Sequence, residues 1–152
     1  MTLTIPMFFW GGWVLILLLL AIIDYRTQRL PDSLTLGLLW MGLLYHNTYS
    51  PDLSPYLWGA VFAYVILQGI TRLFAAIRHQ EGLGQGDIKL CAALGATLGI
   101  TALPKLLLYA ACLGILGFGL RWLIYRRSLQ THCAFGPAIV IAALGIRFIP
   151  WL

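Results

Sequence analysis

The chain has 152 residues, of which 61% are hydrophobic and only 10% are charged. A soluble domain of this size needs more charge on its surface, so the composition excludes an ordinary soluble globular protein. The net charge is +5, but the basic residues lie at the ends of apolar runs and not in a stripe with aromatic residues, which argues against a nucleic-acid partner. Long, continuous apolar runs recur along the sequence, and they predict an all-α, polytopic membrane protein.

We predict one transmembrane domain, residues 1–152, built as a bundle of about six helices. In chain order the helices are expected over residues 6–23, 33–45, 56–76, 88–101 and 106–125, with a last one after Pro137 that ends near 149. Polar segments separate them, and each of the three histidines (His46, His79 and His132) is expected in a loop. Residues 102–105 contain Pro104 and are expected to form a turn.

The basic residues predict the orientation of this bundle. In the six-helix topology, eight of the ten Lys and Arg residues fall on one side and only Lys105 and Arg147 on the other. Cytoplasmic loops carry the excess of basic residues, so the richer side is predicted to be cytoplasmic and both termini to lie on the outer, periplasmic side. The eight are Arg26, Arg29, Arg72, Arg78, Lys89, Arg121, Arg126 and Arg127.

Two polar segments on the cytoplasmic side carry most of the acidic residues. Residues 81–89 form a glycine-rich break that ends in Asp87 at the start of an apolar helix, and residues 24–32 begin with Asp24 directly after the first apolar run. The glycines favour a backbone that another group can approach closely. The break has neither the GK[ST] of a phosphate-binding loop nor a preceding strand, so nucleotide binding is not indicated.

Asp24 and Asp87 are the candidate catalytic pair, because an ionisable group at the edge of the hydrocarbon is costly. When two carboxyls share a partly dry site, one keeps its proton, and together they can activate water and polarise an amide without a metal or cofactor. The sequence does not say which one is the acid. The structural alternatives are that Asp24 pairs with Arg26 or Arg29 and that Asp87 only caps a helix.

Three segments together resemble a known family. Gly84-Gln85-Gly86-Asp87 with Ile88-Lys89-Leu90 is similar to the GxGDxKL motif of the type IV prepilin leader peptidases, which are membrane aspartyl proteases. Asp24 followed by Pro31-Asp32 resembles the other segment of that family, and Phe135-Gly136-Pro137 before the last helix resembles a further family feature. The similarity covers nearly the whole chain.

The resemblance implies an endopeptidase that removes the basic leader of prepilins or pseudopilins, after a glycine and before the hydrophobic helix of the substrate. The site would lie at the cytoplasmic face of a bacterial inner membrane, with Asp24 and Asp87 catalytic and no cofactor or metal. Gly84 and Gly86 would shape the loop, Lys89 would lie near the site, and Pro31 would start the second helix, with Asp32 as its cap.

Long family members carry an additional N-terminal segment with paired CxxC cysteines that is associated with N-methyltransferase activity. We expect a short form without it, and hence no methylation. The alternatives are a related peptidase for preflagellins or other pilin-like precursors and a membrane scaffold or transporter subunit. The sequence does not distinguish a type IV pilus from a type II secretion system. It is compatible with contacts to membrane lipid and with a homo-oligomer.

Overall fold

The computed structural model describes residues 4–78, 83–125 and 135–149, and these residues are helical throughout apart from short connections. The predicted all-α class is therefore confirmed for this part of the chain. The elements are α1 (Thr4–Thr27), α2 (Asp32–Tyr49), α3 (Ser54–Arg78), α4 (Gln85–Leu98), the 3₁₀ helix η1 (Ile100–Ala102), α5 (Leu103–Tyr125) and α6 (Gly136–Phe148).

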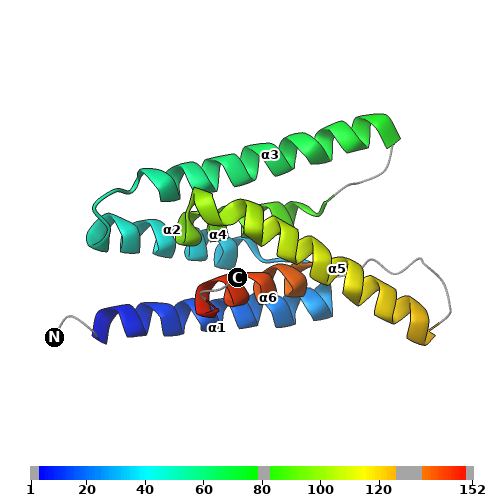
Figure 1. Ribbon diagram of the computed structural model, residues 1–152, viewed down its shortest axis with the longest axis horizontal. Helices are drawn as coiled ribbons and strands as arrows, with labels where there is room; N and C mark the ends of the chain where they lie inside the picture. Colours follow the sequence, from blue (N-terminus) through cyan, green and yellow to red (C-terminus); the bar gives the residue numbers. More distant parts are fainter. Residues whose placement is uncertain (1–3, 79–82, 126–134, 150–152) are drawn as a thin grey trace.

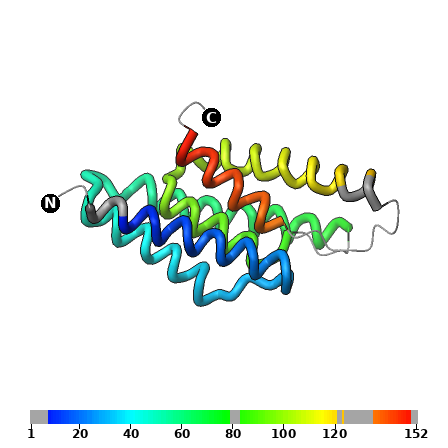
Figure 2. The backbone as a smooth tube through the Cα atoms, turned by 90° about the horizontal axis from the view of Figure 1, so that it is seen from below, coloured from blue at the N-terminus to red at the C-terminus, as the bar shows by residue number. Residues whose placement is uncertain are grey.

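The helices alternate in direction along the bundle. In Figure 1 the C-terminal ends of α1, α3 and α5 point toward the side from which α2, α4 and α6 begin. The helix α4 packs against α2 and α3, whereas α6 packs against α1 and α5. Figure 2 shows α6 running between α1 and α5. The segments that carry Asp24, Asp87 and residues 135–137 are consequently all at one end of the bundle.

The centre of the bundle is α4, which is buried on all sides from Leu90 to Thr97. A helix that is apolar all round belongs inside other helices. Small residues make this possible, because a Cβ built on Gly59 of α3 would lie 2.5 Å from the carbonyl oxygen of Gly95. Gly95 thus lets α4 approach the backbone of α3 closely, but the helix ends earlier than predicted, at Gly99, whose φ of 86° suits only glycine.

The outer surface of the bundle is apolar along the long helices. Three helical stretches are long and apolar enough to cross a membrane, namely Phe8–Thr27, Ser54–Arg78 and Ile100–Leu120, and Gly136–Phe148 is a shorter apolar helix. Large hydrophobic side chains such as Val65, Ile70 and Ile115 are more than half exposed. Exposed apolar surface on this scale is the lipid-facing surface of a helical membrane protein.

The first helix is longer than predicted, and this changes the setting of Asp24. The sequence placed Asp24 after the end of the helix, but α1 continues to Thr27, so Asp24 lies within its last turns. The helix ends where Gln28 adopts a left-handed φ of 51° and donates its N–H to the carbonyl oxygen of Asp24 at 2.9 Å. A residue in this conformation is the usual way to end a helix.

The predicted position of His46 in an outer loop is wrong. The helix α2 continues to Tyr49, and His46 is buried at 6% exposure. One ring nitrogen bonds the carbonyl oxygen of Thr97 at 2.9 Å, the other bonds Ser50 Oγ at 2.8 Å, and the ring stacks on Tyr56. The imidazole is buried because these partners satisfy both of its nitrogens.

The predicted turn over residues 102–105 is also wrong. The chain turns earlier, at Gly99 and the 3₁₀ helix, and α5 already begins at Leu103. Pro104 does not interrupt this helix because it occupies the first turn, where a backbone N–H has no helical acceptor.

Candidate active site

Asp24 is held at the contact between α1 and α6. Its carboxylate Oδ2 accepts a hydrogen bond from the backbone N–H of Gly136 at 3.0 Å, and the side chain is buried at 5% exposure. Gly136 is the first residue of α6. Among the described residues, the ion pair found within 4.0 Å is the one between Lys89 and Asp32. Asp24 therefore forms no ion pair with Arg26 or Arg29 in this part of the chain. The interfacial ion pair considered for Asp24 is wrong for these residues.

Asp87 lies in the first turn of α4, just before the apolar stretch that begins at Ile88. It was considered as a possible helix cap, but the capping position is Gly84, and Asp87 is the third residue of the helix. No capping hydrogen bond from a side chain is found at this helix start. The carboxyl therefore lies near the start of a helix that is buried from Leu90 to Thr97.

The two carboxyl groups influence each other electrostatically. The pKa of Asp87 is raised to about 7, firstly because burial penalises its charged form and secondly because the negative charge of Asp24 opposes its ionisation. Asp87 is thus protonated in a large share of molecules near neutral pH. The structure therefore brings together the two residues that the sequence selected, although they are 63 positions apart (87 − 24).

The glycines before Asp87 allow close packing beside the pair. A Cβ on Gly86 would lie 2.8 Å from Cβ of Leu30, so only a glycine lets this turn of α4 rest on the segment that follows α1. A Cβ on Gly84 would lie 3.4 Å from Asp87 Oδ2, which is an ordinary contact. Gly84 thus borders the carboxyl, and Gly86 holds the two segments together. Glu81 and Gly82 lie outside the described residues.

An ion pair joins the same two segments at the surface. Lys89 Nζ lies 2.7 Å from Asp32 Oδ2, with the side chains 33% and 61% exposed. The predicted role of Asp32 as a helix cap is wrong, because the capping position is Pro31 and Asp32 is the first residue of α2. Pro31 does start this helix as predicted. Asp32 instead ties the start of α2 to α4, two residues beyond Asp87.

An apolar groove of about 570 Å³ lies next to Asp24, between α5 and α6. Tyr25 borders the groove, and so do Phe135 and Pro137, which flank the glycine that binds Asp24. The remaining lining residues are Ala111, Leu113, Gly114, Ile115, Gly117, Phe118, Ala138 and Ile141. The groove thus begins at residues adjacent in sequence to Asp24 and Gly136 and continues along α5 and α6.

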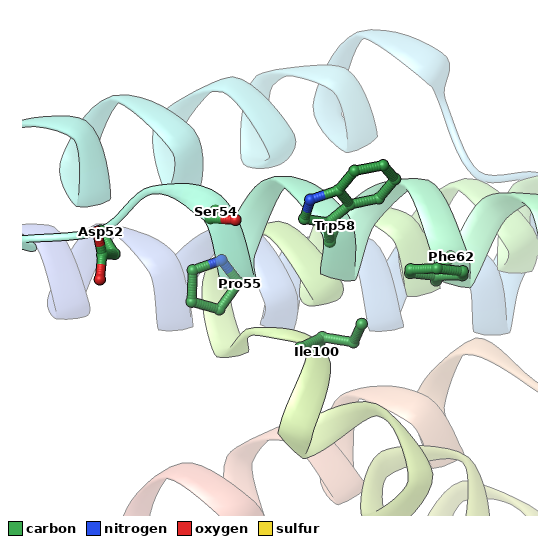
Figure 3. Close-up of a pocket in the computed structure, with 6 residues that line it drawn as sticks. All are labelled: Asp52, Ser54, Pro55, Trp58, Phe62 and Ile100. Carbon is green, nitrogen blue, oxygen red and sulfur yellow. The ribbon is translucent and has the colours of Figure 1, made fainter.

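A second hollow, of about 530 Å³, lies at the N-terminal end of α3. Figure 3 shows Trp58 and Phe62 on α3 with Ile100 opposite them on η1, and Asp52 and Ser54 at one side. Asp52 is the single acidic residue among those that line it. This hollow has no second carboxyl, so the paired-carboxylate chemistry cannot operate there.

No group of three or more His, Cys, Asp or Glu side chains that could hold a metal ion is found among residues 4–78, 83–125 and 135–149.

Sequence reasoning did not find the role of Gly136 in this site. It noted the Phe135-Gly136-Pro137 segment only as a family feature and gave it no contact. The signal was a glycine beside a proline at the start of a helix, since such a start leaves a backbone N–H without a partner. Which acceptor would meet that N–H could not be read from the sequence.

The fold and the site define a helical membrane protein with two interacting carboxyls at one end of its bundle. A model of the type IV leader peptidase family matches residues 12–120 of the chain. The chain is 40% identical over 137 residues to the prepilin leader peptidase/N-methyltransferase of Escherichia coli K12, covering 89% of this chain and 60% of the relative. It is 46% identical over 130 residues to the protein of the same name from Dickeya chrysanthemi, covering 84% and 46%.

Leader peptidase HopD of Salmonella typhimurium is 43% identical over 130 residues, covering 82% of each chain. No solved structure matches the chain. The chain belongs to the type IV leader peptidase family, and the family resemblance found in the motifs is confirmed. It spans 60% and 46% of the length of the Escherichia coli and Dickeya relatives.

Proposed function

We propose that this protein is a membrane-embedded aspartyl endopeptidase that removes the leader peptide of prepilins or pseudopilins. The observation that carries the proposal is the pairing of Asp24 with Asp87, in which burial and, secondly, the charge of Asp24 raise the pKa of Asp87 to about 7. The relatives named as prepilin leader peptidases support the choice of substrate.

The reaction needs one ionised and one protonated carboxyl. The ionised carboxylate takes a proton from water, and the water oxygen attacks the carbonyl carbon of the scissile amide. The protonated carboxyl gives its proton to the carbonyl oxygen, which forms a neutral tetrahedral intermediate. Collapse of this intermediate breaks the C–N bond, with one proton passing to the leaving amine and one returning to the second carboxyl. The net change is the addition of one water molecule to one amide.

The proposed topology has six crossings. The three long helices cross the membrane, and the apolar stretches 33–45, 88–98 and 137–148 complete the bundle within one domain. The excess of Lys and Arg at the end that carries the aspartates places that end in the cytoplasm of a bacterium, and both termini on the periplasmic side. Asp87 then lies at the membrane boundary, where water and a leader peptide can reach it.

The groove beside Asp24 gives the apolar helix of the substrate a place to bind. It starts at the residues that flank the Asp24–Gly136 contact and continues along α5 and α6, so a helix lying in it has its end at the carboxylates. A Cβ built on Gly117, which lines the groove, would have no atom within 4 Å, so the groove is open at this position. The basic leader would then extend away from the groove, past the two carboxyls.

The groove assignment is tested by Gly117→Leu, which fills open space without contact to Asp24. We expect KM for a prepilin to rise severalfold while kcat stays near that of the wild type, because only substrate binding is obstructed. Gly69→Ala, on α3 and also without neighbours within 4 Å, is the control. An unchanged KM would show that the substrate helix binds elsewhere.

Cleavage of a prepilin in membranes tests the function itself. The wild type should release the leader, and Asp24→Asn and Asp87→Asn should each lose at least about a hundredfold in rate at normal protein levels. Asp52→Asn, an exposed acid away from the site, is the matched control and should cleave like the wild type. Cleavage by both Asn variants at the wild-type rate would remove the two aspartates from the mechanism.

Two other functions have defined outcomes in the same assay. If the wild type cuts preflagellin or another pilin-like precursor but no prepilin, the chemistry stands and the substrate changes. If it cuts none of these, a scaffold or transporter role takes precedence. Methyl transfer to the new N-terminus can be followed with labelled methyl donor in the same reaction.

A further inference from the structure

The start of α6 has an unusual partner for its first backbone donor. The first N–H groups of a helix have no acceptor within the helix. Pro137, the second residue of α6, offers no N–H, and the capping residue Phe135 has no side-chain oxygen. Gly136 is buried, and its N–H donates to Asp24 Oδ2 at 3.0 Å. A carboxylate from α1 therefore caps α6.

Only glycine permits this approach. A Cβ built on Gly136 would lie 2.5 Å from Oδ2, 2.8 Å from Cγ and 3.1 Å from Cβ of Asp24. Real side chains do not approach so closely, and Asp24 cannot withdraw easily because it is itself buried on a regular helix. The contact is thus specific for a glycine at this position.

The surroundings of the two carboxyls differ. Asp24 is buried, which by itself disfavours a charge, but it receives a hydrogen bond from a backbone N–H at the positive end of a helix, and these two contacts favour a negative charge on it. Asp87 also lies in the first turn of a helix, but in the part of the chain that the structure describes no hydrogen bond reaches its carboxyl. Its partial burial penalises a charge that is not offset by a hydrogen bond from the described residues.

We propose that Gly136 is a positioning residue whose backbone N–H holds the Asp24 carboxylate ionised and aimed at water, which leaves Asp87 as the carboxyl that carries the proton. This assignment rests on the proposed endopeptidase function. Asp24 accepts the proton of the attacking water, and Asp87 protonates the carbonyl oxygen of the scissile bond. After the C–N bond breaks, the proton on Asp24 leaves with the amine, and Asp87 recovers its own from the tetrahedral hydroxyl.

The first test is Gly136→Ala in purified full-length protein with a prepilin substrate. The added methyl group displaces the carboxylate from its donor, so kcat should fall about 10- to 100-fold, which corresponds to one hydrogen bond to a charged group. KM should stay within about twofold, because Gly136 is not among the residues that line the groove proposed for the substrate helix. A purely structural role would instead reduce the amount of folded protein and leave the kcat of the remainder unchanged.

The control is Gly69→Ala, the same substitution on α3 at a position with nothing within 4 Å. It should match the wild type in kcat and KM. A folded Gly136→Ala protein with the wild-type kcat, or with its whole loss in KM, would overturn the positioning role. If the wild type cleaves no precursor, the proposed function itself fails, and this outcome is separate from the first two.

The second test compares Asp24→Asn with Asp87→Asn and remains decisive if Gly136→Ala does not fold. An amide at position 87 is still a neutral hydrogen-bond donor, whereas an amide at position 24 cannot take a proton from water. The residual rate of Asp87→Asn should therefore exceed that of Asp24→Asn by about tenfold or more. Equal residual rates, or the reverse order, would overturn the assignment.

Discussion

The two ends of the bundle each bury polar groups, but they do so in different ways. At one end, His46 has partners for both ring nitrogens, on Thr97 and Ser50, and stacks on Tyr56. At the other end, Asp24 has one backbone donor, and the second carboxyl, Asp87, is partly buried and affected by the charge of Asp24. The histidine cluster satisfies its polar groups, whereas the aspartate pair keeps two groups of the same sign together.

This difference separates a structural cluster from a candidate site in the same protein. A buried polar group with a complete set of partners stabilises the fold. A buried pair whose charges oppose each other lowers stability and is retained where it serves chemistry. Variants at the two ends should therefore affect activity and stability in opposite ways.

A large loss of activity is expected for Asp87→Asn, exceeded only by the loss for Asp24→Asn. Activity on a prepilin should fall by at least about a hundredfold, whereas the midpoint of thermal unfolding in detergent should stay the same or rise, because the variant removes a buried group that can ionise. Parallel cleavage assays and unfolding curves check both values. A variant that loses activity only in proportion to its loss of folded protein would contradict the comparison.

The pH dependence of cleavage should reflect the pKa of Asp87, which is raised to about 7. One carboxyl must hold a proton, so kcat/KM should fall by about tenfold per pH unit above that value. The measurement is a pH profile of kcat/KM on one prepilin. A rate that stays constant up to pH 9 would show that Asp87 does not supply the proton.

The free energy of unfolding should also depend on pH, because the pKa of the Asp87 carboxyl differs between the folded and unfolded states. The pKa of Asp87 is higher in the folded protein than in the unfolded chain, so between about pH 4 and 7 the unfolded state binds fewer protons. The free energy of unfolding should therefore decrease as pH rises through this window and then level off for this group. Asp87→Asn should reduce that slope in unfolding curves recorded across the range.

His46→Ala should lower stability and leave activity unchanged, which is the opposite of the result expected for Asp87→Asn. It removes two hydrogen bonds and a stacking contact, so the free energy of unfolding should drop by about 1–3 kcal/mol. Activity per folded molecule should remain that of the wild type, because His46 is in the last turn of α2 and Asp24 is near the end of α1, and the C-terminal ends of these two helices lie at opposite ends of the bundle (Figure 1). A catalytic defect in the folded fraction would place His46 in the mechanism.

The smallest effect is expected at the ion pair between Lys89 and Asp32. Both side chains are partly exposed, and such pairs contribute about 0–1 kcal/mol. Asp32→Asn should therefore leave stability nearly unchanged and reduce cleavage only slightly. Restoration of any lost rate by exchanging the two residues, Asp32→Lys with Lys89→Asp, would show that the pair supports the register of α4.

Much of this arrangement could be predicted from local sequence. The apolar runs gave the helices and their order, and the end at which Asp24 and Asp87 lie followed from the alternation of helices between polar segments. The helix ends were predicted less well. The prediction ended the first helix before Asp24 and the second before His46, because a polar residue after an apolar run was taken as its end.

Burial in the tertiary structure explains those differences. His46 is helical because Thr97 and Ser50 satisfy its ring, and Thr97 is 51 residues away in the chain. Asp24 remains helical because Gly136, 112 residues away, provides a donor for its carboxylate. Neither partner leaves a signal in the sequence around the residue that it binds.

The sequence by itself determined the class of protein, the two aspartates and the family, because hydrophobicity, charge and short motifs are local properties. Only the tertiary structure decided how the two aspartates differ. Which carboxyl receives a backbone donor from another helix depends on the helices that meet across the bundle. The start of α6 lies against Asp24 and not against Asp87 because Gly136 has no side chain to prevent that contact.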